Sequence, residues 1–425
     1  MKRAMNTSIS LAAILMTTAA GAAQLPSAEV MWEIIQKQQQ EIEALKNRQQ
    51  TTDEKVEATG EVLDQMQTGS PATASTDHKP ARDGHGVSST AFSHGGSGKT
   101  VVGGYGEMHY NNLDNQTNGL DDKKEIDLHR AILFLGHEFN DRIRFWSELE
   151  VEHAQSGEGK DGGEVAMEQA YLEFDINENL SSRAGLLLVP AGILNEVHEP
   201  NTFYGVERNP VENKIIPTTW REGAVSLNGR FGEGWSYDLM VHSGFNTNAG
   251  KNYAVRNGRQ SAREANANDL AYTGRIKWTG LPGVELAVTA QYQSDMTQSI
   301  DSSAGSATLV ETHVIANRGP FGLRALYASW DLDGSGPAAV GADEQSGWYI
   351  EPSFKVTPRV GVFARYNSWD NQAGNSTDTE YTQIDFGVNY WPHPDVVLKA
   401  DYQTQDAPSG KDEFDGFNLG VGYQF

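Results

Sequence analysis

Seven charged or titratable side chains are concentrated in one long segment of the chain, Val189–Trp220. They are Glu196, His198, Glu199, Glu207, Arg208, Glu212 and Lys214. The segment also carries four of the fifteen prolines and has no regular period of its own. A long irregular segment is usually functional or disordered, and apolar residues such as Phe203 and Ile215 argue against disorder. We therefore expect a folded loop that narrows a pore, where its charges act on passing ions and polar solutes.

Two further sets of charged residues alternate with apolar residues along short segments. The acidic set lies on the earlier segments and consists of Glu148, Glu150, Glu152, Glu173 and Asp175. The basic set lies later and consists of Arg230, Arg275, Lys277, Arg324, Lys355, Arg365 and Lys399. If the two sets face each other across a lumen, their field would filter solutes by charge and dipole. The alternative is that each charge only hydrates the lumen and pairs with its neighbours.

The segments that carry these charges have a period of two residues. Ile143 and Phe145, for example, alternate with Arg144 and Trp146. About sixteen such segments of roughly 10–13 residues follow one another from residue 100 onward, and this is the length and period of membrane-spanning β-strands. The apolar series is expected to face lipid and the polar series a wet lumen.

The connectors between these segments alternate between short turns and long loops. Seven are short, such as Gly319-Pro320, and eight are long, such as 246–268. Outer-membrane barrels have short periplasmic turns and longer external loops. The pattern predicts an all-β fold, an antiparallel transmembrane barrel of about sixteen strands over residues 100–425, with 190–219 as its third external loop.

Composition agrees with a barrel and disfavours other classes. Hydrophobic residues make up 38% of the 425, the mean hydropathy is −0.53, and no apolar run of about 20 residues follows the N-terminus. The 44 glycines suit many turns, while the absence of cysteine leaves no disulfide or thiolate metal site. A net charge of −24 makes nucleic acid an unsuitable partner. We expect no metal and no cofactor.

The N-terminus has the features of an export signal. Lys2 and Arg3 precede the apolar stretch Ile9–Met16, and small residues follow through Ala23. This order predicts a cleaved signal peptide over residues 1–23. A permanent membrane anchor is the alternative, but the apolar core is too short to span a bilayer.

Residues 24–68 carry a heptad repeat. Ala28, Ile35 and Ile42 fall seven residues apart, and a second series follows three residues after each. A seam sustained over about six heptads predicts a periplasmic, homo-oligomeric coiled coil, either a dimer or a trimer. The alternative is a single helix packed on the barrel.

Residues 69–99 are rich in Ser, Thr, Gly and Ala and predict a flexible linker. Its histidines, His78, His85 and His94, are loosely spaced and have no acidic or cysteine partners that would frame a metal site.

Several motifs resemble the phosphate-selective porin family of the O and P type. They include GGYGEMHYNN at 103–112, LFLGHEFNDRIRFWSELEVEHA at 133–154 and AGILNEVHEPNTFYGVERNPVENKIIPTTWREG at 191–223. The resemblance covers roughly Val101 to Phe425. It implies a trimeric, sixteen-stranded outer-membrane porin whose third external loop folds inward.

Members of that family use a ladder of arginines and lysines along the pore. Here Glu and Asp interrupt the inward basic residues, so the resemblance transfers neither phosphate specificity nor any ladder position. An external basic cluster, Arg256, Arg259 and Arg263, could still gather anions at the mouth.

The sequence thus predicts an outer-membrane porin, a water-filled diffusion channel for small charged or polar solutes, with anions such as phosphate among the candidates. Its partners would be membrane lipid, two further copies of itself and the solutes. One alternative adds an envelope partner for the coiled coil, which would then act as a tether. A barrel enzyme is the other alternative, although no GxSxG elbow occurs and no Ser-His-Asp set can be assigned.

Overall fold

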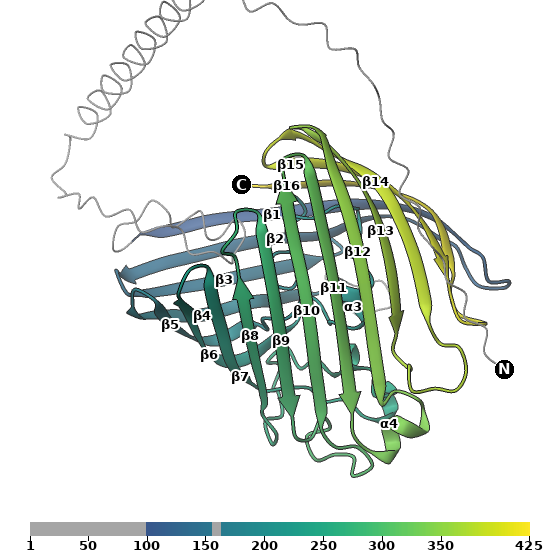
Figure 1. Ribbon diagram of the computed structural model, residues 1–425, viewed down its shortest axis with the longest axis horizontal. Coiled ribbons are helices and arrows are strands. Elements are labelled where there is room, and N and C mark those ends of the chain that lie inside the picture. Colours follow the sequence, from purple (N-terminus) through teal and green to yellow (C-terminus); the bar gives the residue numbers. More distant parts are fainter. Residues whose placement is uncertain (1–98, 155–162) are drawn as a thin grey trace, which may run out of the picture. The chain divides into compact units, whose positions relative to one another are not determined.

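The computed structural model describes residues 99–154 and 163–425. The predicted signal peptide, coiled coil and all but the last residue of the linker lie outside this part. Sixteen strands close into an antiparallel barrel (Figure 1). The strands are β1 (Thr100–Asn115), β2 (Lys123–Asn140), β3 (Ile143–Glu152), β4 (Val165–Asn177), β5 (Leu180–Leu188), β6 (Arg221–Phe231), β7 (Trp235–His242), β8 (Ala271–Trp278), β9 (Val284–Gln293), β10 (Ala307–Arg318), β11 (Phe321–Leu332), β12 (Glu344–Thr357), β13 (Val360–Asp370), β14 (Tyr381–His393), β15 (Val396–Asp406) and β16 (Phe414–Gln424). The predicted fold class of the barrel is confirmed.

Closure of the barrel removes the open strand edges that lipid could not satisfy. Each strand pairs with the next in sequence, and β1 pairs with β16. At this seam the N–H of Phe425 donates to the carbonyl of Gly104 at 2.9 Å, and the N–H of Gly104 donates to the carbonyl of Phe425 at 3.0 Å.

The period of two places apolar side chains outside and polar ones inside. On β9, Leu286 and Val288 are exposed on the outer face, whereas Ala287 and Thr289 are buried on the inner face. Exposed aromatics such as Trp235, the residue that begins β7, lie near the strand ends. Such outward aromatics form the interfacial girdles of membrane barrels.

Trp391 does not belong to this girdle. It follows the inward phase of β14, and its ring lies 5.8 Å from the ring of Tyr204 in the third long loop.

None of the helices within residues 99–154 and 163–425 is long and apolar enough to cross a membrane.

Among the register shifts of the described strands, two β-bulges lie inside the strands rather than at their ends and interrupt the regular alternation. Between β1 and β2 the register shifts at Glu107 and His109, and between β3 and β4 it shifts at Glu148 and Leu149. A bulge places two residues opposite one and re-aims their side chains. Both bulges face the long loop between β5 and β6.

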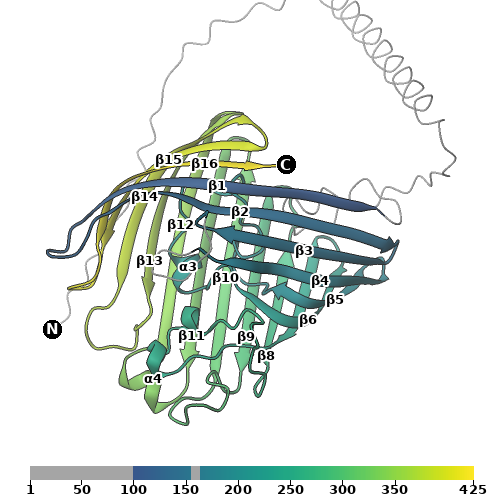
Figure 2. The same ribbon diagram turned by 180° about the vertical axis from the view of Figure 1, so that it is seen from behind.

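That loop, residues 189–220, is called loop 3 below, and 243–270, between β7 and β8, is called loop 4. Loop 3 contains the short helix α3 (Val211–Lys214), which lies against β12 and β13 (Figure 2). Loop 4 contains two 3-10 turns, η1 (Ala249–Lys251) and η2 (Val255–Gly258), and α4 (Ser335–Ala339) lies between β11 and β12. Long loops and short turns alternate as predicted.

We predict that Gly104→Ala destabilises the barrel at its seam. A Cβ at this position would lie 2.4 Å from the backbone oxygen of Ile132, so β1 or β2 would have to shift. Overpacking of this kind costs about 1–3 kcal/mol and should lower the thermal unfolding temperature followed by circular dichroism.

Gly274→Ala on β8 is the matched control. Among the described residues, its Cβ would meet only a methyl group of Leu239, at 3.6 Å, which is an ordinary contact distance. Equal unfolding temperatures for the two variants would show that the seam tolerates the displacement.

Candidate functional site

Loop 3 is folded into the barrel by apolar packing. Val211, Ile215 and Ile216 are fully buried in one cluster with side chains of β11, including Trp330. The indole N–H of Trp330 donates to the carbonyl of Ile215 at 3.0 Å. The loop therefore folds inward, and it lies against the inner face of β11 and β12, a position that the sequence did not specify.

A buried carboxylate fixes the centre of loop 3. Glu212 accepts hydrogen bonds from the N–H of Leu194 at 2.5 Å, the N–H of Ile193 at 3.2 Å and the hydroxyl of Tyr349 on β12 at 3.0 Å. Burial raises the pKa of Glu212 above its ordinary value, although these hydrogen bonds oppose the shift. Glu212 was expected to border the open path, but it is an internal anchor of loop 3.

Asn195 ties the two ends of loop 3 together. Its side-chain oxygen accepts from the N–H of Trp220 at 2.6 Å, and its amide donates to the carbonyls of Val189 at 2.7 Å and Trp220 at 3.0 Å. No sequence pattern singles out this residue, because its partners lie up to 25 positions away.

Two arginines of the predicted external cluster hold loop 3 from outside. Arg256 donates to the carbonyls of Asn213 and Thr218, and Arg259 donates to those of Pro217 and Thr219, at 2.5–3.2 Å. Burial, with the neighbouring Arg259 and Arg208, lowers the pKa of Arg256 to about 10. Arg263 is exposed. The three residues thus do not share one environment at the mouth.

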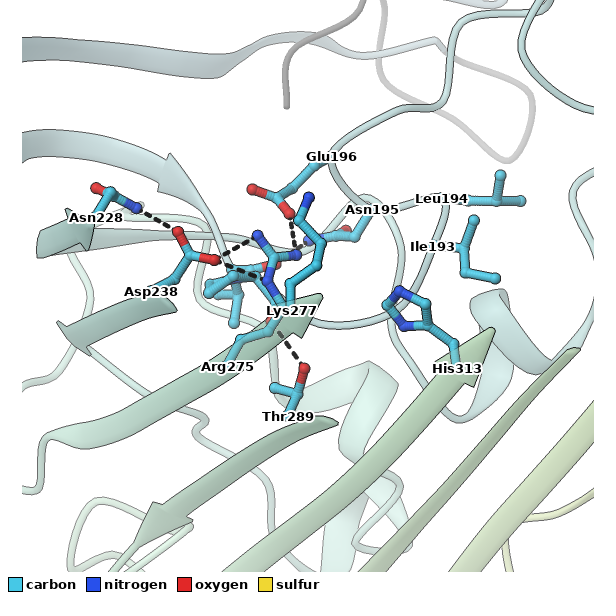
Figure 3. Close-up of polar contacts among 12 residues, drawn as sticks. Ile193, Leu194, Asn195, Glu196, Asn228, Asp238, Arg275, Lys277, Thr289 and His313 are labelled. Carbon is cyan, nitrogen blue, oxygen red and sulfur yellow. Dashed lines mark hydrogen bonds and ion pairs between the residues drawn. The ribbon is translucent and has the colours of Figure 1, made fainter. Parts of the chain in front are cut away.

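On the lumen side, loop 3 meets a guanidinium of β8. Arg275 lies between Asp238 on β7, at 2.6 Å, and Glu196 of loop 3, with which it forms an ion pair (Figure 3). Asn228 donates to the same Asp238 carboxylate at 2.6 Å. On one side of this group, Lys277 forms an ion pair with Glu285 at 3.4 Å.

A second ion-pair group lies on β12, β13 and β14. Arg365 contacts Glu351 at 3.0 Å and Asp385 at 3.1 Å, and it also donates to the carbonyl of Tyr204 in loop 3 at 3.3 Å. All three charged side chains are buried. The positive charge on this strand is therefore already opposed by two carboxylates.

The acidic residues of the early strands are also paired locally. Glu173 contacts Arg144 at 2.5 Å and Arg183 at 2.7 Å, and Asp175 contacts Arg144 at 2.7 Å. An acidic wall opposite a basic wall was expected from the sequence. In the structure the charges are interleaved, because neighbouring strands contribute opposite charges at the same level.

A further cluster joins loop 3 to β1 and β2. Arg130 contacts Glu107 at 2.6 Å and donates to the carbonyl of His198 at 2.7 Å. His198 in turn lies 3.4 Å from Glu168, which the β4 bulge turns inward, and 4.0 Å from Glu148. His198 and Glu148 were predicted from the sequence as site residues, whereas Glu107, Arg130 and Glu168 were not.

Three cations of the predicted basic set, Arg324, Lys355 and Lys399, contact a carbonyl group or aromatic rings. Arg324 donates to the carbonyl of Thr202 at 2.6 Å. The ammonium of Lys355 lies 3.1 Å from the ring centre of Trp391, and that of Lys399 lies 3.5 Å from the ring centre of Phe203. All three lie near the periplasmic ends of their strands.

The remaining selected residues have varied surroundings. Glu150 is buried on the inner face of β3, with Glu152 at the strand's outer end. Glu199 is buried, Lys214 is exposed, and Arg230 is exposed near the periplasmic end of β6. In loop 3, Arg208 donates to the Thr219 hydroxyl at 3.0 Å, and Glu207 contacts His109 on β1 at 3.1 Å.

A closed sixteen-stranded barrel with a long loop folded against its charged inner face defines an outer-membrane channel of the porin class. The model of the family described as phosphate-selective porin O and P matches residues 102–425. The chain belongs to this family, and its fold and family point to a channel rather than an enzyme. A protein of Aquifex aeolicus strain VF5, described as uncharacterized, is 32% identical over 350 residues, 73% of this chain and 77% of that one.

Solved structures share the fold at lower identity. The anion-selective porin from Comamonas acidovorans is 12% identical, with a TM-score of 0.55 over 77% of this chain and 100% of that chain. The trimer form of OmpT from Vibrio cholerae is also 12% identical, with a TM-score of 0.51 over 78% of this chain and 100% of that one. At these identities the likeness shows the barrel fold alone.

We predict that Glu212→Ala loosens loop 3. Two buried N–H groups and a tyrosine hydroxyl would lose their acceptor, at about 1–3 kcal/mol for each unsatisfied group. Single-channel recordings should then show a larger and noisier conductance. Glu233→Ala, in the exposed turn between β6 and β7, removes the same charge outside the lumen and should leave the record unchanged. A quiet Glu212→Ala channel of unaltered conductance would contradict the anchoring role.

Proposed function

We propose that this porin is a general diffusion channel for small hydrophilic solutes, with loop 3 setting the size limit and only a weak preference for either charge. The observation that carries the proposal is that guanidinium groups beside loop 3 are matched by carboxylates of the protein. Arg275 has two such partners, Arg365 has two and Arg130 has one. The proposal assigns the chain no catalytic step.

The pairing bears directly on phosphate as a solute. A phosphate selected by arginine needs guanidinium N–H groups that are free to form paired hydrogen bonds. At Arg275 and Arg365 those groups already donate to carboxylates. A passing anion would have to displace a fixed negative charge, so a strong phosphate preference is not proposed.

The lumen also retains positive charge. Arg324, Lys355 and Lys399 contact a carbonyl group or aromatic rings. These three cations lie near the periplasmic end, whereas carboxylates dominate around Arg275 and along the inner face of β3 and β4. We infer that small solutes of both signs pass.

Arg275 is the residue at which the proposal is tested. We expect Arg275→Gln to shift the reversal potential in a salt gradient toward cation preference, since Glu196 and Asp238 would lose their counter-charge. The double variant Glu196→Gln with Asp238→Asn should shift it toward anions. An uncompensated unit charge 4 Å from an ion is worth about 1 kcal/mol in water, roughly fivefold in local ion concentration.

The control is Glu178→Gln, which removes one unit charge in the exposed turn between β4 and β5, away from the lumen. If both Arg275-site variants keep the reversal potential of this control, the conducting path does not pass Arg275. A purified chain that yields no stepwise conductance in planar bilayers would overturn the channel proposal itself.

We further propose that the protein is a homotrimer in the outer membrane and that residues 24–68 form a periplasmic coiled coil that strengthens it. The heptad seam and the trimer form of a structural neighbour support this proposal. A coiled coil on the periplasmic side is also placed to bind another component of the envelope.

Charges placed in the seam should weaken the trimer without altering the pore. The variant replaces Ile35, Ile42 and Leu45 with Asp, and each buried unpaired charge is costly. Heat should dissociate this variant at a lower temperature on native gels, with unit conductance unchanged. The control places Asp at the flanking positions Gln36, Gln40 and Ala44. A changed unit conductance would show that the helix lies in or over the channel.

A further inference from the structure

The geometry points to a metal-binding site in the lumen, formed by His109 on β1, His129 on β2 and Glu207 of loop 3. One ligand atom from each residue lies within 4.8 Å of the other two. Two imidazoles and one carboxylate suit a divalent transition-metal ion such as Zn²⁺ rather than Mg²⁺, which prefers oxygen ligands. We propose that this cluster binds such an ion.

The β1–β2 bulge creates the cluster. The register pairs Glu107 with Arg130 and His109 with Asp127, so one residue of β1 faces two of β2. His129 is one of those two, and its ring stacks on the ring of His109 with centroids 4.5 Å apart. Bulges commonly re-aim side chains at functional sites.

Carboxylates outside the cluster orient both imidazoles. Nε2 of His109 lies 3.3 Å from Glu107, which Arg130 holds at 2.6 Å, while Nδ1 faces Glu207 at 3.1 Å. Nδ1 of His129 lies 3.5 Å from Asp127. A metal-binding histidine usually donates its second N–H to such a carboxylate, which fixes the ring and its tautomer.

The burial of the three residues leaves the ion accessible from the lumen. The side chain of His109 is 4% exposed, whereas those of His129 and Glu207 are 34% and 35% exposed. The two rings are only 14° from parallel, so His129 must tilt for both nitrogen atoms to point at one ion. Its exposed side chain has the space to do so, and water can supply the remaining ligands.

The competing explanation is that the cluster only attaches loop 3 to the barrel wall. That role needs His109 and Asn111, which contact Glu207 at 3.1 and 3.0 Å. It does not need His129, because His129 makes no hydrogen bond to loop 3 within the described part of the chain. Replacing His129 therefore separates the two explanations.

The test measures Zn²⁺ binding by isothermal titration calorimetry on the purified full chain in detergent. His129→Asn should weaken the site at least about tenfold, the scale on which even an outer-shell change lowers metal affinity. His393→Asn is the matched control, because His393 also lies beside a carboxylate, Asp395 at 3.3 Å, but in a periplasmic turn. It should bind as the unmutated chain does.

Glu207→Gln is a second variant that preserves side-chain size and lies in a loop, so it tests the site if His129→Asn does not fold. Circular dichroism establishes that each variant is folded, and Mg²⁺ should not replace Zn²⁺. Zn²⁺ binding that is absent, or equal in the unmutated chain and both variants, would overturn the proposal. The measurement needs no conductance, so its outcome is independent of the proposed solute preference.

Discussion

The architecture depends on the attachment of loop 3 inside the barrel, and that attachment depends on one buried carboxylate. A loop inside a lumen must satisfy its own backbone groups, because buried N–H groups without partners are costly. Glu212 accepts from two of them and from Tyr349 on the wall. Because Arg256 and Arg259 bind carbonyl groups at the far end of the loop, its lumen-facing residues are held at fixed positions beside the strands.

Beside this loop, the register of the strands explains why the lumen charges largely cancel. The principal ion pairs join residues that are directly opposite in the register of adjacent strands: Glu107 with Arg130, Arg144 with Glu173, Glu173 with Arg183, Asp238 with Arg275, and Arg365 with Asp385. Opposite charges at such positions stabilise the sheet. Loop 3 then adds Glu196 to one of these pairs, and the constriction gains a second carboxylate without a new cation.

The same register separates what the sequence could predict from what it could not. The period of two assigns inward and outward faces correctly for residues such as Glu148 and Arg275, because alternation is a local property of a strand. To predict an ion pair, one must know the register between two strands. This register can be counted across a short turn but not across a long loop. Pairs on either side of a short turn, such as Glu173 with Arg183 and Glu351 with Arg365, were within reach of such an argument. The inward orientation of Glu168 and His129 was not predicted, because bulges change the alternation of their strands.

Pairing across neighbouring strands also bears on how a porin scaffold can change its solute preference. Each cancelling carboxylate lies on a neighbouring strand or, for Glu196, in loop 3. Replacing one acidic residue therefore releases a guanidinium while the apolar outer face and the backbone ladder remain unchanged. Where an arginine has two carboxylates, as Arg365 does, loss of one leaves the charge still opposed. Under the proposed function, selectivity in this barrel would be controlled less by the number of basic residues in the lumen than by which of them face an acidic residue across the strand pair.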